Sequence, residues 1–155
     1  MHPSAVFEPS GISRRARVVI AAIGVAVAAA VLVASSAATS PTSRACPSAS
    51  VVNAALGQKG GAPVSTKTAY SKKCTYPGGV LPTSITFQVD TAATFAVSEK
   101  AVSALGIVKV RGLGQAAWAT KAGGSLYVFY GGTTIKILAP LTATTKLEVL
   151  ARKLL

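Results

Sequence analysis

The two cysteines, Cys46 and Cys74, are the residues best suited to chemistry in this chain. An even pair of cysteines in a small domain outside the cytoplasm usually forms a disulfide. A metal site or a catalytic thiol would need a histidine or a nearby carboxylate, and no histidine follows Cys46. We therefore predict a Cys46–Cys74 disulfide, worth about 3.5 kcal/mol in the chain-entropy model, and no metal site.

Groups for acid–base catalysis are scarce. His2 is the only histidine, and Asp90, Glu99 and Glu148 are the only carboxylates from Cys46 onward. Asp90 and Glu148 occupy positions typical of helix caps, so neither is a good candidate for a general base. Serines and threonines are plentiful but lack a base to activate them, apart from an unsupported Ser–Lys pair. We expect no catalytic residue and no cofactor.

The chain is strongly basic, with a net charge of +12. From Lys59 to Lys153, twelve Lys and Arg residues stand against three acids, which gives +9 for this part. Such an excess favours contact with phosphate polymers, acidic polysaccharide or lipid headgroups. Several of these residues fall on predicted strands or turns and are candidate ligand-binding residues if they share one face of a sheet: Lys72, Lys73, Lys109, Arg111, Lys121 and Lys136.

Aromatic residues could add stacking surface to such a basic patch: Tyr70, Tyr76, Trp118, Tyr127 and Tyr130. The alternative is that these aromatics belong to the core and that the lysines are scattered. The sequence leaves both interpretations open.

The segment Gly112-Leu113-Gly114-Gln115-Ala116-Ala117 matches the dinucleotide fingerprint G-x-G-x-x-A. That fingerprint requires a following helix and an acidic residue about 20 positions later. Here the β-prone Trp118 and a Gly-Gly turn follow, and the region around Lys136 has no acid. We predict a tight turn between strands.

Residues 18–38 form an apolar segment preceded by Arg14, Arg15 and Arg17. Its uncharged core and the two serines after it are about long enough to cross a bilayer. The positive-inside rule places residues 1–17 in the cytoplasm and everything after residue 38 outside. We expect a transmembrane signal anchor, then a linker at 39–45, then an extracytoplasmic domain at 46–155.

Two alternatives to the anchor remain open. Cleavage after Ser36-Ala37-Ala38 would release a secreted protein. Acylation of Cys46 would make a lipoprotein, but Arg44 disrupts the small apolar pattern that precedes such a cysteine.

Hydrophobic periodicity and turn residues predict the elements of the domain. A first helix is capped by Ser48 or Ser50 and ends at Gly57, and a second is capped by Asp90 or Thr91 and ends at Gly106. A last helix begins with a capping box of Thr145 and Glu148. The predicted strands cover 71–76, 84–89, 107–110, 116–120, 125–130 and 133–139.

Strands joined by short glycine turns must pair antiparallel. Three amphipathic helices need a sheet face to cover. The predicted fold is therefore an α+β two-layer domain, with an antiparallel sheet of about five strands and about three helices on one face.

Five short motifs of the domain occur together in a known family. They are Cys46-Pro47, Val52-Asn53-Ala54-Ala55-Leu56-Gly57, Cys74-Thr75-Tyr76, Gly112-Leu113-Gly114-Gln115-Ala116-Ala117 and Leu126-Tyr127-Val128. By these motifs the chain resembles small actinobacterial cell-envelope proteins of unknown function, many of them lipoproteins, and more distantly the extracellular sensor domains of receptor kinases. The resemblance covers most of residues 46–155 and implies a disulfide-bearing α+β domain, without an established activity. Gln115 stands where the family commonly has an acid, and the lipoprotein signal before Cys46 is missing.

These observations favour a non-enzymatic module of the cell envelope. Its expected partners are the cytoplasmic membrane, through residues 18–38, and an anionic envelope polymer, lipid headgroups or an envelope protein. Nucleic acid is not an expected partner, because the domain lies outside the cytoplasm. The alternatives are a serine-dependent hydrolase or transferase and a purely structural accessory protein.

Overall fold

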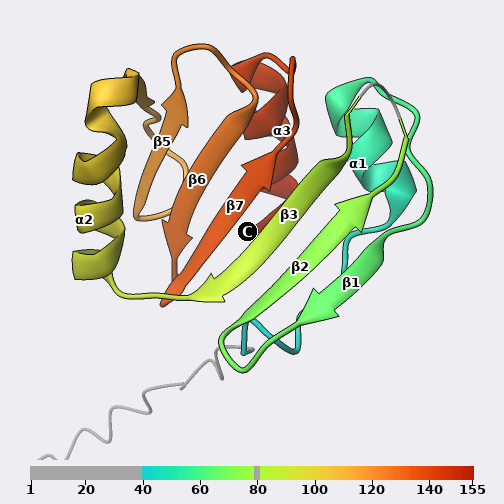
Figure 1. The fold of residues 1–155 in the computed structure, drawn as a ribbon, viewed down its shortest axis with the longest axis horizontal. Helices are drawn as coiled ribbons and strands as arrows, with labels where there is room; N and C mark the ends of the chain where they lie inside the picture. Colours follow the sequence, from blue (N-terminus) through green and yellow to red (C-terminus); the bar gives the residue numbers. More distant parts are fainter. Residues whose placement is uncertain (1–39, 79–80) are drawn as a thin grey trace, which may run out of the picture. The chain divides into compact units, whose positions relative to one another are not determined.

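A computed structural model of the chain describes residues 40–78 and 81–155, so the predicted tail at 1–17 and anchor at 18–38 lie outside the described residues. It shows an α+β domain with one antiparallel sheet of seven strands and three α-helices (Figure 1). The predicted fold class is confirmed, although the sheet is larger than the predicted five strands. The elements are α1 (Ala49–Leu56), β1 (Val64–Lys67), β2 (Ser71–Tyr76), β3 (Thr83–Val89), α2 (Ala92–Val102), β4 (Ile107–Lys109), β5 (Ala116–Thr120), β6 (Ser125–Tyr130), β7 (Thr133–Leu138) and α3 (Thr144–Leu154).

The sheet consists of two antiparallel runs that meet at its centre. The strand order is β1-β2-β3-β7-β6-β5-β4. After β3 the chain passes through α2 to the far edge, enters the sheet at β4 and returns strand by strand to pair β7 with β3. The last strands of the two runs, β3 and β7, therefore pair with each other, which joins the two halves into one sheet.

Helices α1 and α3 pack against each other and cover one face of the sheet. Val52 and Leu56 from α1 and Leu147 and Leu150 from α3 are buried in this layer. The strands contribute alternate residues to the same core, as the pleat of a sheet requires. The sheet residues of this core are Cys74, Tyr76, Ile85, Phe87, Ala117, Ala119, Leu126, Val128, Ile135 and Ile137.

Helix α2 covers part of the opposite face, so the prediction that all helices lie on one face is wrong. Its only buried residue, Phe95, lies 6.3 Å from the ring of Trp118 and 5.7 Å from the ring of Phe129. Trp118 alternates along β5 with Ala117 and Ala119, which belong to the core beneath α1 and α3. Because successive side chains on a strand point to opposite faces, α2 lies on the other side of the sheet.

The first two helices begin as predicted, but the last does not. The Ser48 hydroxyl accepts a hydrogen bond from the Val51 backbone N–H, and Gly57 ends α1 in the left-handed conformation. Thr91 caps α2. The expected Thr145–Glu148 capping box is wrong: α3 begins after Ala143 without a side-chain cap, which places Thr145 inside the first turn.

Several strand boundaries also differ from the predictions. Strand β1 was missed because its four residues, VSTK, are all exposed and show no alternation of apolar and polar side chains. Strand β4 ends at Lys109, so Arg111 lies beyond it. The segment from Gly112 leads into strand β5 and not into a helix, which excludes the dinucleotide fingerprint.

The Cys46–Cys74 disulfide is confirmed, with 5.7 Å between the two Cα atoms. It joins the segment before α1 to strand β2 and lies on the face of the sheet that α1 and α3 cover. Within the described part of the chain, no helix has the length and apolar character needed to span a bilayer.

Candidate functional site

The six predicted basic residues do not form one patch. Lys73, Lys109 and Lys136 lie on the same face as α2, in a single cross-strand row. Lys72 lies on the opposite face, because it neighbours Lys73 on β2. Arg111 and Lys121 follow the ends of β4 and β5 and belong to turns.

The cross-strand row runs through all seven strands and includes two stacked aromatic rings. The Lys136 amine lies 5.1 Å from the centre of the Tyr127 ring, and Tyr127 stacks on Trp118 at 3.8 Å. At the far end, Lys109 forms a 3.0 Å ion pair with Glu99. The members of the row are Thr66, Lys73, Thr86, Lys136, Tyr127, Trp118 and Lys109.

The row offers little concentrated positive charge. Lys73 and Lys136 stand two strands apart, about 10 Å between backbones, with Thr86 between them. Glu99 neutralises Lys109 locally. A cavity of about 380 Å³ near Lys109 and Arg111 contains the same glutamate. An anion would therefore meet only separated lysines on this face.

Arg44 and Lys72 make a tighter arrangement on the opposite face. The Lys72 amine donates a 2.8 Å hydrogen bond to the Arg44 carbonyl oxygen. The Arg44 guanidinium in turn donates a 3.0 Å bond to the Leu154 carbonyl oxygen and lies 5.8 Å from the centre of the Phe87 ring. These contacts hold the segment before α1 against β2, β3 and the end of α3.

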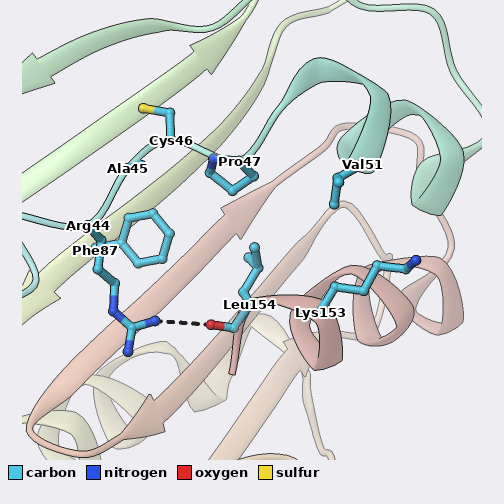
Figure 2. Close-up of a pocket in the computed structure, with 8 residues that line it drawn as sticks. All are labelled: Arg44, Ala45, Cys46, Pro47, Val51, Phe87, Lys153 and Leu154. Carbon is cyan, nitrogen blue, oxygen red and sulfur yellow. Dashed lines mark hydrogen bonds between the residues drawn. The ribbon is translucent and has the colours of Figure 1, made fainter. Parts of the chain in front are cut away.

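A cavity of about 480 Å³ opens beside Arg44, a size typical of small-molecule sites. Figure 2 shows Pro47, Val51, Phe87 and Leu154 around it, with the guanidinium of Arg44 bonded to the Leu154 carbonyl oxygen and the amine of Lys153 extending away from Arg44. Phe87 comes from β3, Val51 from α1, and Leu154 and Lys153 from α3. Four apolar side chains thus line a site that has the Arg44 guanidinium at one side.

The charged side chains that line this cavity, those of Arg44 and Lys153, are both basic. Among the residues that the structure describes, Lys109–Glu99 is the only ion pair, so Arg44, Lys72 and Lys153 have no acidic partner there. Lys67 lies directly opposite Lys72 on β1. Two like charges in facing positions destabilise a sheet slightly. This basic cluster of Arg44, Lys67, Lys72 and Lys153 therefore creates a positive electrostatic potential, which a bound anion would reduce.

The chemistry of the lining suits binding better than catalysis. No carboxylate, histidine or hydroxyl lines the cavity, and Cys46 is tied up in the disulfide. In residues 40–78 and 81–155, no three His, Cys, Asp or Glu residues come close enough together to hold a metal ion. What the site can provide is charge, hydrogen-bond donors and apolar contact.

Of the six predicted ligand-binding residues, only Lys72 belongs to this cluster. Arg44 falls in the predicted linker at 39–45, and Lys153 is not among the six. The contact between Arg44 and Leu154 joins residues 110 positions apart, which local sequence patterns do not reveal. The chain matches no family model, no curated protein and no solved structure.

Proposed function

We propose that the chain is a non-enzymatic module of the cell envelope that binds an anionic component outside the cytoplasmic membrane. The observation that carries this proposal is the cavity beside the Arg44 guanidinium, with Lys153 in its lining and Lys72 bonded to the Arg44 carbonyl oxygen. Its cations have no acidic partner among the described residues, and its walls are apolar. Such a site is arranged to accept negative charge.

The disulfide supports the location. Disulfides form and persist outside the reducing cytoplasm, and Cys46–Cys74 leaves no free cysteine in the described part of the chain. The proposed topology keeps residues 1–17 inside and uses residues 18–38 as the anchor, with cleavage and secretion as the alternative. The resemblance to actinobacterial envelope proteins agrees with this location.

The excess of positive charge supports an anionic partner. Charges that lack internal partners raise the local concentration of anions and speed their association. Because salt screens exposed charges, binding should weaken as the ionic strength rises.

The test uses the full chain in nanodiscs of zwitterionic lipid, which adds no anionic surface. Two anionic probes are offered, polyphosphate and phosphatidylglycerol vesicles, with dextran and phosphatidylcholine vesicles as neutral controls. We expect at least one anionic probe to bind more tightly than its neutral control, with an affinity that falls with salt. Failure of both anionic probes to exceed their controls at low salt would refute the proposal.

A matched pair of lysines shows where the anion binds. Lys72 and Lys73 are neighbours on β2 and lie on opposite faces of the sheet. Lys72→Gln removes a charge beside the cavity and the bond to the Arg44 carbonyl oxygen, worth about 1 kcal/mol, so binding should weaken about threefold to tenfold. Lys73→Gln removes the same charge from the other face and should change binding less than about twofold. Equal effects of the two variants would contradict binding at the cavity.

A further inference from the structure

We infer that the ligand of the cavity is an anionic phospholipid, whose phosphate contacts Arg44 and whose acyl chain lies against the partly exposed side chains of Pro47, Val51 and Leu154. This inference rests on the proposed function and narrows it to one ligand class and one site. Three features of the cavity support it: its apolar wall, the state of the Arg44 side chain, and its place in the chain.

The exposed wall of the cavity is more apolar than polar. Pro47, Val51, Phe87 and Leu154 line it next to the guanidinium of Arg44 (Figure 2). Burying apolar surface is the main driving force for occupying such a wall. A polyphosphate or a sugar acid would satisfy Arg44 but leave the wall in contact with water. An amphiphile satisfies both.

The Arg44 side chain is held in place but keeps donors to spare. Its half-buried guanidinium is fixed by the bond to the Leu154 carbonyl oxygen and by the Phe87 ring. One bond uses one of five N–H donors. The remaining donors form a planar fork that matches the oxygens of a phosphate. The described residues offer no carboxylate to occupy them.

The cavity also lies close in sequence to the predicted anchor. Arg44 follows the end of the apolar segment, residue 38, by six positions, which span about 20 Å at most when fully extended. In the anchored form, the chain length alone would therefore keep Arg44 within about 20 Å of the end of the anchor. Lys153 lines the cavity, Lys72 is bonded to the Arg44 carbonyl oxygen, and Lys67 lies opposite Lys72 on β1, so these lysines would attract anionic headgroups.

The test is photo-crosslinking of the full chain in membranes. The probes are phosphatidylglycerol and phosphatidylcholine with the same photoactivatable acyl chain, and mass spectrometry locates the labelled peptides. We expect the phosphatidylglycerol probe to label the segments that contain Val51, Phe87 and Leu154. The phosphatidylcholine probe should label them at least about tenfold less, because it has no net charge for Arg44 and the lysines to attract.

Two variants with matched controls separate charge from shape. Arg44→Gln should reduce labelling of these segments about tenfold to a hundredfold, through loss of charge-assisted hydrogen bonds, whereas Arg111→Gln should leave it within about twofold. Val51→Trp fills the cavity without changing any charge and should also abolish labelling. Val97→Trp, on the exposed side of α2, should not. Thermal melts of each variant show that it is folded.

The possible outcomes distinguish this inference from the proposed function. Within residues 46–155, labelling only outside the cavity, equal labelling of the cavity by the two lipids, or no effect of Arg44→Gln and Val51→Trp would overturn the lipid site. So would displacement of the lipid by inorganic phosphate as readily as by dodecyl phosphate, because the acyl chain would then add nothing. If polyphosphate still binds in any of these cases, the anionic module stands and only the lipid is refuted.

Discussion

At the scale of single residues, Tyr76 shows how burial makes stability depend on pH. Its phenol donates a 2.7 Å hydrogen bond to the Pro47 carbonyl oxygen, and its side chain is buried beneath α1. Burial raises the pKa of Tyr76 from 10.0 to about 12, because the phenolate cannot be solvated there. The folded protein therefore keeps a proton that the unfolded chain releases above pH 10.

This difference predicts a loss of stability in alkali. The contribution of Tyr76 is fully present below the unfolded pKa of 10.0 and is lost as pH rises toward about 12. Within that window, the free energy of unfolding should fall by up to about 1.4 kcal/mol per pH unit. Urea unfolding at a series of pH values measures the slope. Tyr76→Phe cannot ionise and should flatten it, after an initial cost of about 1 kcal/mol for the lost hydrogen bond. A slope equal in the two proteins would assign the effect to other groups.

The charged residues show which part of the site a sequence can predict. Counting residues gives the net charge of +9 in the domain, and this charge leads us to expect an anionic partner. The face of each lysine follows only when the strand register is known, as Lys72 and Lys73 demonstrate. Arg44 and Lys153 come together through tertiary contacts between the two ends of the domain. No periodic pattern in the sequence indicates that these two residues are close in the fold.

At the scale of elements, the turn at residues 112–114 depends on two glycines with different surroundings. Both have positive φ angles, 68° at Gly112 and 61° at Gly114. A Cβ atom on Gly114 would lie 2.6 Å from the Phe129 carbonyl oxygen on β6, whereas a Cβ atom on Gly112 would meet nothing within 4 Å. Both positions therefore need glycine for their positive φ angles. Only position 114 also needs it because β6 lies too close for a Cβ atom.

Alanine substitutions should separate these two requirements. Gly112→Ala pays only the conformational penalty, about 1–2 kcal/mol of unfolding free energy. Gly114→Ala adds a backbone clash, which must push β5 away from β6, so we expect a loss larger by at least about 1–3 kcal/mol. Chemical denaturation of the two variants measures the difference. Equal losses would mean that the turn moves to accept a side chain.

Elements with strong local signals were predicted, and those defined by tertiary packing were not. Ser48 and Gly57 mark the ends of α1, and the glycine pair Gly131-Gly132 marks the hairpin between β6 and β7. Strand β1 has no apolar pattern and exists because its backbone pairs with β2. Phe95 is the only buried residue of α2 and alone decides which face of the sheet the helix covers. A single buried residue gives too weak a period to be read from sequence.

At the scale of the whole molecule, the disulfide connects the stability of the domain to its binding site. Cys46 lies in the lining of the cavity, two residues after Arg44, and Cys74 lies in the central part of β2. The bond therefore holds the segment that carries Arg44 against the sheet. Closing a loop of 28 residues stabilises the folded state by about 3.5 kcal/mol in the chain-entropy model.

Removing the disulfide should therefore affect folding and binding together. The double variant Cys46→Ala with Cys74→Ala should lose about 2–5 kcal/mol of unfolding free energy, as native disulfides in small domains typically do. Under conditions where it remains folded, it should bind the phosphatidylglycerol probe more weakly, because Arg44 is then held only by its hydrogen bonds and the Phe87 ring. Melts with and without reductant, followed by crosslinking of the folded fraction, measure both effects.

Reductant should lower the melting temperature of the native protein and leave that of the double variant unchanged. If reductant leaves the melting temperature of the native protein unchanged, the disulfide does not stabilise the domain. Full labelling of the double variant would show that the remaining contacts suffice to hold Arg44 at the cavity.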